Sequence, residues 1–330
     1  MNSSVMAIIL TLCEAVRRGT PLLLGTTGEI LNEKSGSLNL GVEGTMAVGA
    51  ITGALLGLTT SNMFLAFLGA FVGGMLCGLI YAFLTITLKA NQNVTGLAIT
   101  IFGSGLCLFI GEALKASDKF PAYTTEFYAE ITSGGIPGLK DIPYVGQLLF
   151  SYNALVYIAI VIALIVWIYI TKTKSGLRMR AAGENPAAAD SVGINIDAER
   201  YKNIIIGSGI MGLGGVYMAL FINNGLWNTD WIAGYGWIAV ALVIFANWSS
   251  ARAIWGSYVF GLLLALRSRM PSLASAFPSI LSWSTAIPTE VFDALPFIVT
   301  MLVLIFTSMR KKKSTGSPAG LGLNYFREER

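Results

Sequence analysis

The chain has 330 residues, of which 54% are hydrophobic and 12% are charged, with a formal net charge of +4. Soluble globular domains carry about 25% charged residues, so this composition favours an integral membrane protein. Histidine is absent, which excludes triads, metal sites and proton shuttles built on imidazole. The basic residues lie beside apolar segments, where anionic lipid explains them better than nucleic acid does.

Apolar runs predict where the chain crosses the membrane. A helix needs about 20 residues to span a hydrocarbon core of about 30 Å, and the sequence predicts about nine such spans, with eight to ten as the range. The expected spans are residues 5–25, 40–59, 63–88, 94–115, 148–170, 204–222, 232–248, 253–269 and 291–309. We therefore expect an all-α, polytopic helical bundle over residues 1–309, with interrupted helices, followed by a basic, flexible tail over residues 310–330.

The first expected span is unusually charged. It contains Glu14, Arg17 and Arg18, which are spaced to pair on one helical face, and then Pro21. Proline removes a backbone hydrogen bond inside a helix. A clean crossing and a helix broken before Pro21 both fit this pattern.

Residues 24–50 combine several glycines with acidic residues. Interrupted backbone at membrane depth is tolerated only where protein or a water-filled cavity covers it, so the segment indicates a transport pathway or a packed bundle interior. Glu43 fits an acid in the first turns of a helix, where free N–H groups stabilise it. Direct contact of Glu43 with a solute is the alternative, and Asn39 belongs to the same segment.

Two further polar clusters flank apolar spans. Amides and hydroxyls at the start of the fourth span either cap a helix or hydrogen-bond a polar ligand. A second cluster follows the sixth span, where tryptophan is typical of the membrane interface and stacking on a ligand is the alternative. With Asn39 and Glu43, the candidate translocation pathway comprises Asn91, Gln92, Asn93, Thr95, Asn223, Asn224 and Trp227.

The loop over residues 171–203 predicts a short capped helix. Asn185 suits the N-cap, Pro186 the first helical position and Gly193 the C-terminal stop. Such a helix either orders the loop or docks into a groove of a partner. The candidate docking residues are Gly183, Glu184, Asn185, Pro186, Ala187, Ala188, Ala189, Asp190 and Gly193.

The run GSGIMGLGG at residues 207–215 is rich in small residues. Small residues let membrane helices approach closely, so we expect helix packing here, with a hinge as the alternative. The three cysteines are far apart in apolar stretches and are expected to be packing residues.

The basic residues also predict the orientation. If residues 171–203 are cytoplasmic, fifteen lysines and arginines fall in connections on that side and five on the other. The C-terminus is then cytoplasmic and the N-terminus lies outside.

Several blocks carry a family resemblance over nearly the whole chain. The most specific are GSLNLGVEG within residues 20–50 and GENPAAADSVGIN within residues 176–195; others are residues 90–106, 134–150 and 234–248. They resemble the permease subunit of bacterial ATP-binding-cassette importers, in the family of branched-chain amino acid, simple-sugar and nucleoside permeases. The sequence is closest to the nucleoside and simple-sugar branch. It departs from that branch at Trp248, which is followed by Ser249 where the branch usually has proline.

The resemblance implies alternating access in the bacterial plasma membrane, driven by a separate cytosolic ATPase into which the Asn185–Gly193 helix docks. No GxxxxGK[ST] phosphate loop occurs in the sequence, so ATP and magnesium belong to that ATPase and no cofactor or metal is expected in this chain. The resemblance further implies a second permease subunit, identical or homologous, and an extracytoplasmic Bmp-type binding lipoprotein. The expected solute is neutral and polar, nucleosides first and simple sugars as the alternative.

Two other classes compete with this interpretation. An ion-coupled secondary transporter needs ionisable groups near the midplane, and only Glu43, Glu112 and Asp293 qualify. A membrane enzyme has less support, because the sequence offers no recognisable pair of nucleophile and base.

Overall fold

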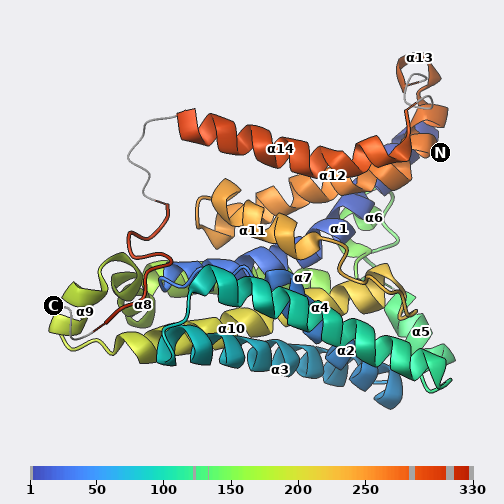
Figure 1. The fold of residues 1–330 in the computed structure, drawn as a ribbon. Coiled ribbons are helices and arrows are strands. Elements are labelled where there is room, and N and C mark those ends of the chain that lie inside the picture. Colours follow the sequence, from blue (N-terminus) through green and yellow to red (C-terminus); the bar gives the residue numbers. More distant parts are fainter. Residues whose placement is uncertain (1–2, 122–123, 133, 282–286, 310–315, 327–330) are drawn as a thin grey trace.

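The computed structural model describes residues 3–121, 124–132, 134–281, 287–309 and 316–326 (Figure 1). These residues form helices and connections without any strand, which confirms the all-α prediction. The helices are α1 Ser3–Lys34, α2 Val42–Thr60, α3 Met63–Ala82, α4 Gln92–Ala116, α5 Thr125–Thr132, α6 Val145–Phe150, α7 Ala154–Lys172, α8 Lys174–Glu184, α9 Pro186–Ser191, α10 Ile196–Tyr217, α11 Tyr235–Phe245, α12 Ser250–Ala276, α13 Pro278–Leu281 and α14 Thr289–Met309. Two π-helical turns, η1 Phe83–Thr87 and η2 Met218–Ile222, extend α3 and α10.

Five of the described helices are long and apolar enough to cross a membrane. They are α2, α3 with η1, α4, α7, and α10 with η2. The chain is thus a multi-pass membrane protein, while the number of nine spans stays a prediction. The expected span over residues 232–248 is corrected, because α11 covers only Tyr235–Phe245 and its 11 residues are too few to cross alone.

Helix α1 is continuous over 32 residues and passes through Pro21 without a break. Of the two alternatives for this segment, the helix broken before Pro21 is therefore wrong. The expected charge pairing is found for one arginine, because Arg18 Nε lies 2.7 Å from Glu14 Oε1. Helix α1 packs against α10, α11 and α12, and these contacts hold a helix that its sequence alone does not favour. The true interruption of residues 24–50 lies between Lys34 and Val42.

Helix α10 lies at the centre of the bundle and packs against α1, α2 and α3. A Cβ atom on Gly28 of α1 would stand 2.3 Å from the carbonyl oxygen of Gly207, and one on Gly49 of α2 would stand 2.3 Å from the Cα atom of Gly212. Backbones that approach this closely leave no room for a side chain. The glycine run at residues 207–215 therefore serves helix packing.

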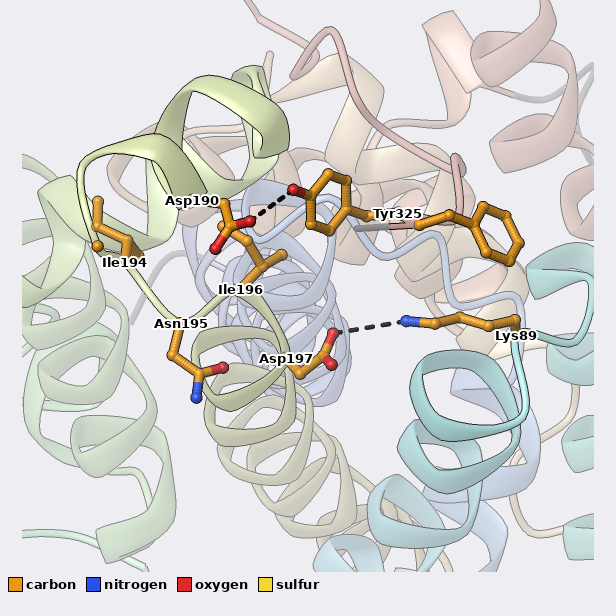
Figure 2. A pocket seen from close by; sticks show the side chains of 9 residues that line it. Lys89, Asp190, Ile194, Asn195, Ile196, Asp197 and Tyr325 are labelled. Carbon is orange, nitrogen blue, oxygen red and sulfur yellow. Dashed lines mark hydrogen bonds and ion pairs between the residues drawn. The ribbon is translucent and has the colours of Figure 1, made fainter. Parts of the chain in front are cut away.

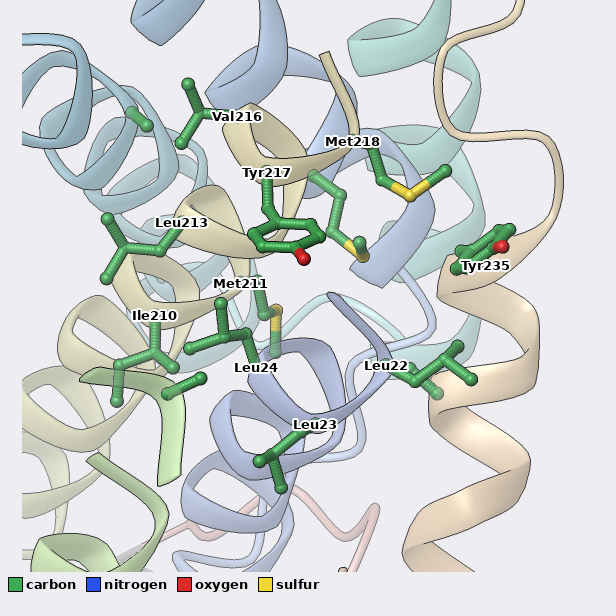
Figure 3. Close-up of a cluster of buried hydrophobic side chains, with 14 of the residues drawn as sticks. Leu22, Leu23, Leu24, Ile210, Met211, Leu213, Val216, Tyr217, Met218 and Tyr235 are labelled. Carbon is green, nitrogen blue, oxygen red and sulfur yellow. The ribbon is translucent and has the colours of Figure 1, made fainter. Parts of the chain in front are cut away.

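Large side chains fill the space beside these close crossings. Figure 3 shows Leu22, Leu23 and Leu24 of α1 facing the same core as Met211 and Tyr217 of α10. Other apolar side chains, such as Ile101 and Phe109 on α4 and Ile165 on α7, are exposed on the outside of the bundle. An apolar exterior around a packed interior is expected of helices that face lipid.

Two other expected boundaries differ from the structure. The segment expected as one span over residues 148–170 divides into α6 and α7, with a break at residues 151–153. Helix α12 continues past the expected end at residue 269, through Pro271 to Ala276.

The tail also differs from the expected flexible end. Residues 316–326 lie in a defined path against α8, α9 and the start of α10, whereas residues 310–315 and 327–330 lie outside the described residues. Figure 1 shows this segment beside α8 and α9, at the end of the bundle opposite to the one where α1 begins.

Replacing Gly28 by alanine tests the central crossing. Because the new Cβ atom would meet the Gly207 carbonyl oxygen, we expect Gly28→Ala to destabilise the bundle by about 1–3 kcal/mol. Gly105 of α4 is the matched control, because a Cβ atom there meets nothing within 4 Å. Thermal unfolding in detergent should show a lower midpoint temperature for Gly28→Ala than for the parent chain, and an unchanged one for Gly105→Ala. Equal midpoints in the two variants would contradict the close crossing.

Candidate functional site

Helices α8 and α9 form a capped element between two apolar helices. The side chain of Asn185 accepts a hydrogen bond from the Ala188 amide at 3.1 Å, and Pro186 occupies the first turn of α9. Gly193 has a φ of +83° and ends the element, as expected. The Asn195 side chain then caps α10 through the Ala198 amide at 3.0 Å. The local prediction of a short, capped helix is therefore confirmed.

One face of this element is buried and the other is exposed. Ala182 and Ala189 pack against Ile196 in a small apolar cluster of their own. Ala187 and Ala188 are exposed, and Val192 is 75% exposed. Small, exposed apolar side chains on a rigid helix are suited to a partner's groove.

The element is joined tightly to the end of α1. A Cβ atom on Gly183 would lie 2.4 Å from the Lys34 carbonyl oxygen, so α8 ends directly against α1. The Glu184 carboxylate accepts a hydrogen bond from the Ala319 amide at 3.1 Å. Lys34 Nζ donates to the Gly316 carbonyl at 2.6 Å, and its partial burial lowers the pKa of this lysine. Gly183 and Glu184 thus link the capped α8–α9 element to the rest of the chain.

The structure divides the pathway candidates between the two ends of α4. At the first end, the Gln92 side chain accepts from the Leu38 amide at 2.8 Å, and Asn39 Oδ1 accepts from the Gly41 amide at 2.8 Å. Asn91 accepts from the Val94 amide and so caps α4, which is the first of the two roles expected for this cluster. Asn93 is exposed at this end, and Thr95 is buried one turn further along α4.

At the other end of α4, an aromatic cluster surrounds Trp227. Its indole nitrogen donates to Glu112 Oε1 at 2.7 Å, and its ring lies 4.9 Å from that of Trp231 and 5.7 Å from that of Phe120. Asn223 follows η2, and its side chain donates to the carbonyl of Met218, the first residue of η2. Asn224 is exposed beside it with a φ of +52°. The nine pathway candidates therefore form no single site.

Glu43 has a partner that the sequence did not reveal. It lies in the first turn of α2, as expected, but its carboxylate accepts hydrogen bonds from the amides of Gly234 at 2.8 Å and Gly236 at 2.6 Å. These amides begin α11, so Glu43 caps a different helix across the bundle. The carboxylate supplies the anion that the N-terminus of a helix attracts. This contact fixes the short α11 against α2.

Sequence reasoning also missed a buried polar cluster at the end of α1. Glu29 is fully buried and accepts from the Asn32 side chain at 3.1 Å and from the Asn39 amide at 3.0 Å. Glu33, also buried, accepts from the Trp248 indole nitrogen. The signal was the spacing of Glu29, Asn32 and Glu33 on one helical face. It was hidden because the helix was expected to end near residue 25.

The turn at Trp248 explains why position 249 is serine and not proline. Trp248 adopts a φ of +53°, and the amide of Ser249 donates to the Ala246 carbonyl at 3.2 Å. A proline at position 249 has no N–H for that bond. This turn directs the indole of Trp248 to Glu33 and links the start of α12 to α1.

The acids that an ion-coupled transporter requires are engaged with protein groups or lie outside the described side chains. Glu43 binds the start of α11 and Glu112 binds Trp227. The side chain of Asp293 lies outside the described part of the chain. Among the described residues, no group of three or more Cys, Asp or Glu side chains is arranged to hold a metal ion.

Comparison with known proteins gives one consistent result. A family model described as "Branched-chain amino acid transport system / permease component" matches residues 11–304. The putative glucose ABC transporter permease protein TsgC13 of Haloferax volcanii is 35% identical, over 95% of this chain and 96% of that protein. The guanosine ABC transporter permease protein NupQ of Bacillus subtilis is 34% identical, over 86% and 87%. The nucleoside ABC transporter permease protein NupC of Lactococcus lactis is 31% identical, over 86% and 88%.

Replacing Glu43 by glutamine tests the link between α2 and α11. The amide keeps one oxygen to accept a hydrogen bond, but its NH₂ group cannot accept from the second backbone N–H. We expect a loss of about 1–3 kcal/mol and faster hydrogen exchange at residues 234–237, measured by mass spectrometry in detergent. Glu126→Gln on the exposed side of α5 is the control. Unchanged exchange in Glu43→Gln would show that α11 is held by other contacts.

Proposed function

The chain belongs to the branched-chain amino acid transport system / permease component family, membrane permeases energised by a separate ATPase, and from this premise we propose that it imports nucleosides. The permease function follows from the family match and from relatives that cover nearly the whole chain. Partnership with an ATP-binding-cassette ATPase belongs to that function. This chain itself is a transport subunit and not an enzyme.

The observation that carries the coupling proposal is the geometry of α9. Its exposed alanines stand on a helix with a side-chain cap at one end and a glycine stop at the other, and α8 seats it against the end of α1. We infer that α9 docks into the ATPase. When the ATPase closes on nucleotide, it would move α8 and, through α8, α1. Such coupling requires that the ATPase bind the two conformations of the permease with unequal affinity, because a partner shifts a conformational equilibrium only in that way.

We further propose that the end of the bundle with α8 and α9 is cytoplasmic, together with the C-terminus. At this end Lys34 and Lys89 bind the 316–326 segment, which also bonds to Glu184 of α8. The excess of lysine and arginine in the connections at this end supports the same orientation. Residues 1–309 are then the permease domain, and the tail is its cytoplasmic extension.

The pathway residues fit the two mouths of a route across the membrane. Gln92 and Glu112 are 20 residues apart on α4, which is about 30 Å along a helix and matches the hydrocarbon thickness. Asn39, Asn91, Gln92, Asn93 and Thr95 then flank the inner mouth. Asn223, Asn224 and Trp227 flank the outer one, and Glu43 positions α11 between them.

Solute would reach the outer mouth from an extracytoplasmic Bmp-type lipoprotein, and a second permease subunit would complete the route. Amide and indole groups near the mouths suit a neutral solute with hydroxyl groups or a base. The names of two relatives, a nucleoside and a guanosine permease, support nucleosides. The glucose permease relative makes simple sugars the second candidate.

Substitution of Ala188 tests the docking role. Arginine at this exposed position would place an unpaired charge in the interface, so we expect ATPase association and solute uptake to fall at least about tenfold, which is 1.4 kcal/mol or more. Ala116→Arg, exposed at the far end of α4, is the matched control for insertion and stability. The measurement is co-purification of the ATPase together with uptake into proteoliposomes. Normal uptake by Ala188→Arg would refute docking through α9.

Competition distinguishes the two candidate solutes. In cells that express the complete transporter, unlabelled adenosine and uridine should suppress uptake of labelled guanosine, whereas glucose and galactose should not. Suppression by the sugars would move the assignment to the simple-sugar alternative. Uptake that survives loss of ATP hydrolysis and collapses with the proton or sodium gradient would instead support a secondary transporter.

A further inference from the structure

The C-terminal segment, residues 316–326, is built into the docking end of the bundle. Its backbone is held at two points, from the Gly320 amide to the Gly183 carbonyl at 2.9 Å and from the Gly322 amide to the Gly36 carbonyl at 3.2 Å. Gly316, Pro318 and Gly320 are buried. The segment therefore follows a fixed course from the end of α1 across the end of α8.

The last described residues join the segment to the connection before α4 and to α9. Asn324 Nδ2 donates to the Lys89 carbonyl at 2.6 Å, and Tyr325 Oη donates to Asp190 Oδ2 at 2.8 Å. The ring of Tyr325 packs on the apolar cluster of Ala182, Ala189 and Ile196. A side chain of α9, which belongs to the candidate docking set, is thus already bound by the C-terminal segment.

Between these parts lies a cavity of about 530 Å³ (Figure 2). Its walls come from the turn after α9, the start of α10, the connection before α4 and the C-terminal segment. The polar and aromatic lining residues are Lys89, Asp190, Asn195, Asp197, Tyr325 and Phe326. Without residues 325 and 326 the cavity would lack one wall, so the C-terminal segment creates it.

The charge of the cavity favours a cationic occupant. Asp190 and Asp197 contribute two carboxylates and Lys89 one ammonium group. The Asp197 carboxylate is 57% exposed and lies 3.5 Å from Lys89 Nζ, so it keeps acceptor capacity toward the opening. An arginine or lysine side chain from a partner complements this arrangement.

Exposed apolar side chains adjoin the cavity. Val192 stands next to the lining residue Gly193 and is 75% exposed, while Phe326 lines the cavity and is 44% exposed. Large apolar side chains exposed beside a charged pocket are typical of an interface with another protein. The surface continues directly from α9, so the same partner would cover both.

We propose that the C-terminal segment forms part of the ATPase-docking surface, and that the cavity beside α9 receives a basic side chain of the ATPase. This inference rests on the proposed function, because it takes the ATPase as the partner of α9. It extends the footprint from one short helix to a composite surface, to which the C-terminal residues contribute one wall of the cavity.

Cysteine protection tests the composite surface. Three variants, Val192→Cys on the α9 side, Phe326→Cys on the C-terminal segment and Glu126→Cys on α5 at the opposite end of the bundle, are labelled with a water-soluble maleimide. Labelling is compared with and without the purified ATPase, and the parent chain gives the background of its three native cysteines. We expect the ATPase to slow labelling at positions 192 and 326 several-fold and to leave position 126 unchanged.

The outcomes separate this inference from the proposed function. Protection of position 192 without protection of position 326 would overturn the composite surface and leave α9 docking in place. Absence of protection at both positions would overturn docking through this end altogether. Labelling of position 326 that is already slow in the absence of the ATPase, and is not slowed further by it, would assign the surface to another copy of this chain. That result would overturn the inference.

The charge of the proposed contact has its own test. Asp197→Asn keeps the size of the side chain and removes one carboxylate from the cavity. We expect it to weaken association with the ATPase at low salt and to have a smaller effect at high salt, because screening reduces the lost attraction. Lys89→Gln should strengthen association under the same conditions. Unchanged association in both variants would overturn the assignment of a basic side chain to the cavity.

Discussion

Contact between backbones at the centre of the bundle determines where the other elements lie. Helix α10 touches α1 at Gly28 and α2 at Gly49 with no side chain between them. Such proximity is possible only with small residues, and it gains van der Waals contact where lipid provides no hydrophobic drive for association. Since α10 directly follows α9, the connection from α9 to this centre is covalent and short.

The middle of the helical bundle is apolar and tightly packed, whereas its two ends are polar. Acidic side chains inside the bundle hold protein groups: Glu43 binds the start of α11, and Glu29 and Glu33 bind the Asn39 amide and the Trp248 indole. A buried carboxylate is costly unless donors surround it, and these donors come from other parts of the chain. Glu43 and Glu33 therefore join segments that are far apart in the sequence, whereas Glu29 holds the turn that follows α1.

Much of this architecture could be predicted from the sequence, and the failures have physical causes. The caps at Asn91 and Asn185 and the stop at Gly193 were predictable because capping depends on neighbouring residues. The continuity of α1 through Pro21 was not, since contacts with α10, α11 and α12 outweigh the local penalty. The Glu43 contact joins residues about 190 positions apart, which no local pattern reveals. The course of residues 316–326 was missed because their composition is that of a flexible end.

The length and continuity of α1 have a mechanical consequence. It is continuous over 32 residues, which is about 48 Å of rigid rod, and α8 meets it at the Lys34 end. Its opposite end packs against α6 and α12. A rod held by a close crossing at Gly28, near its Lys34 end, acts as a lever with Gly28 near the fulcrum. A small displacement of the short arm beyond Gly28 would then produce a larger one at the far end of the long arm, at the opposite end of the bundle.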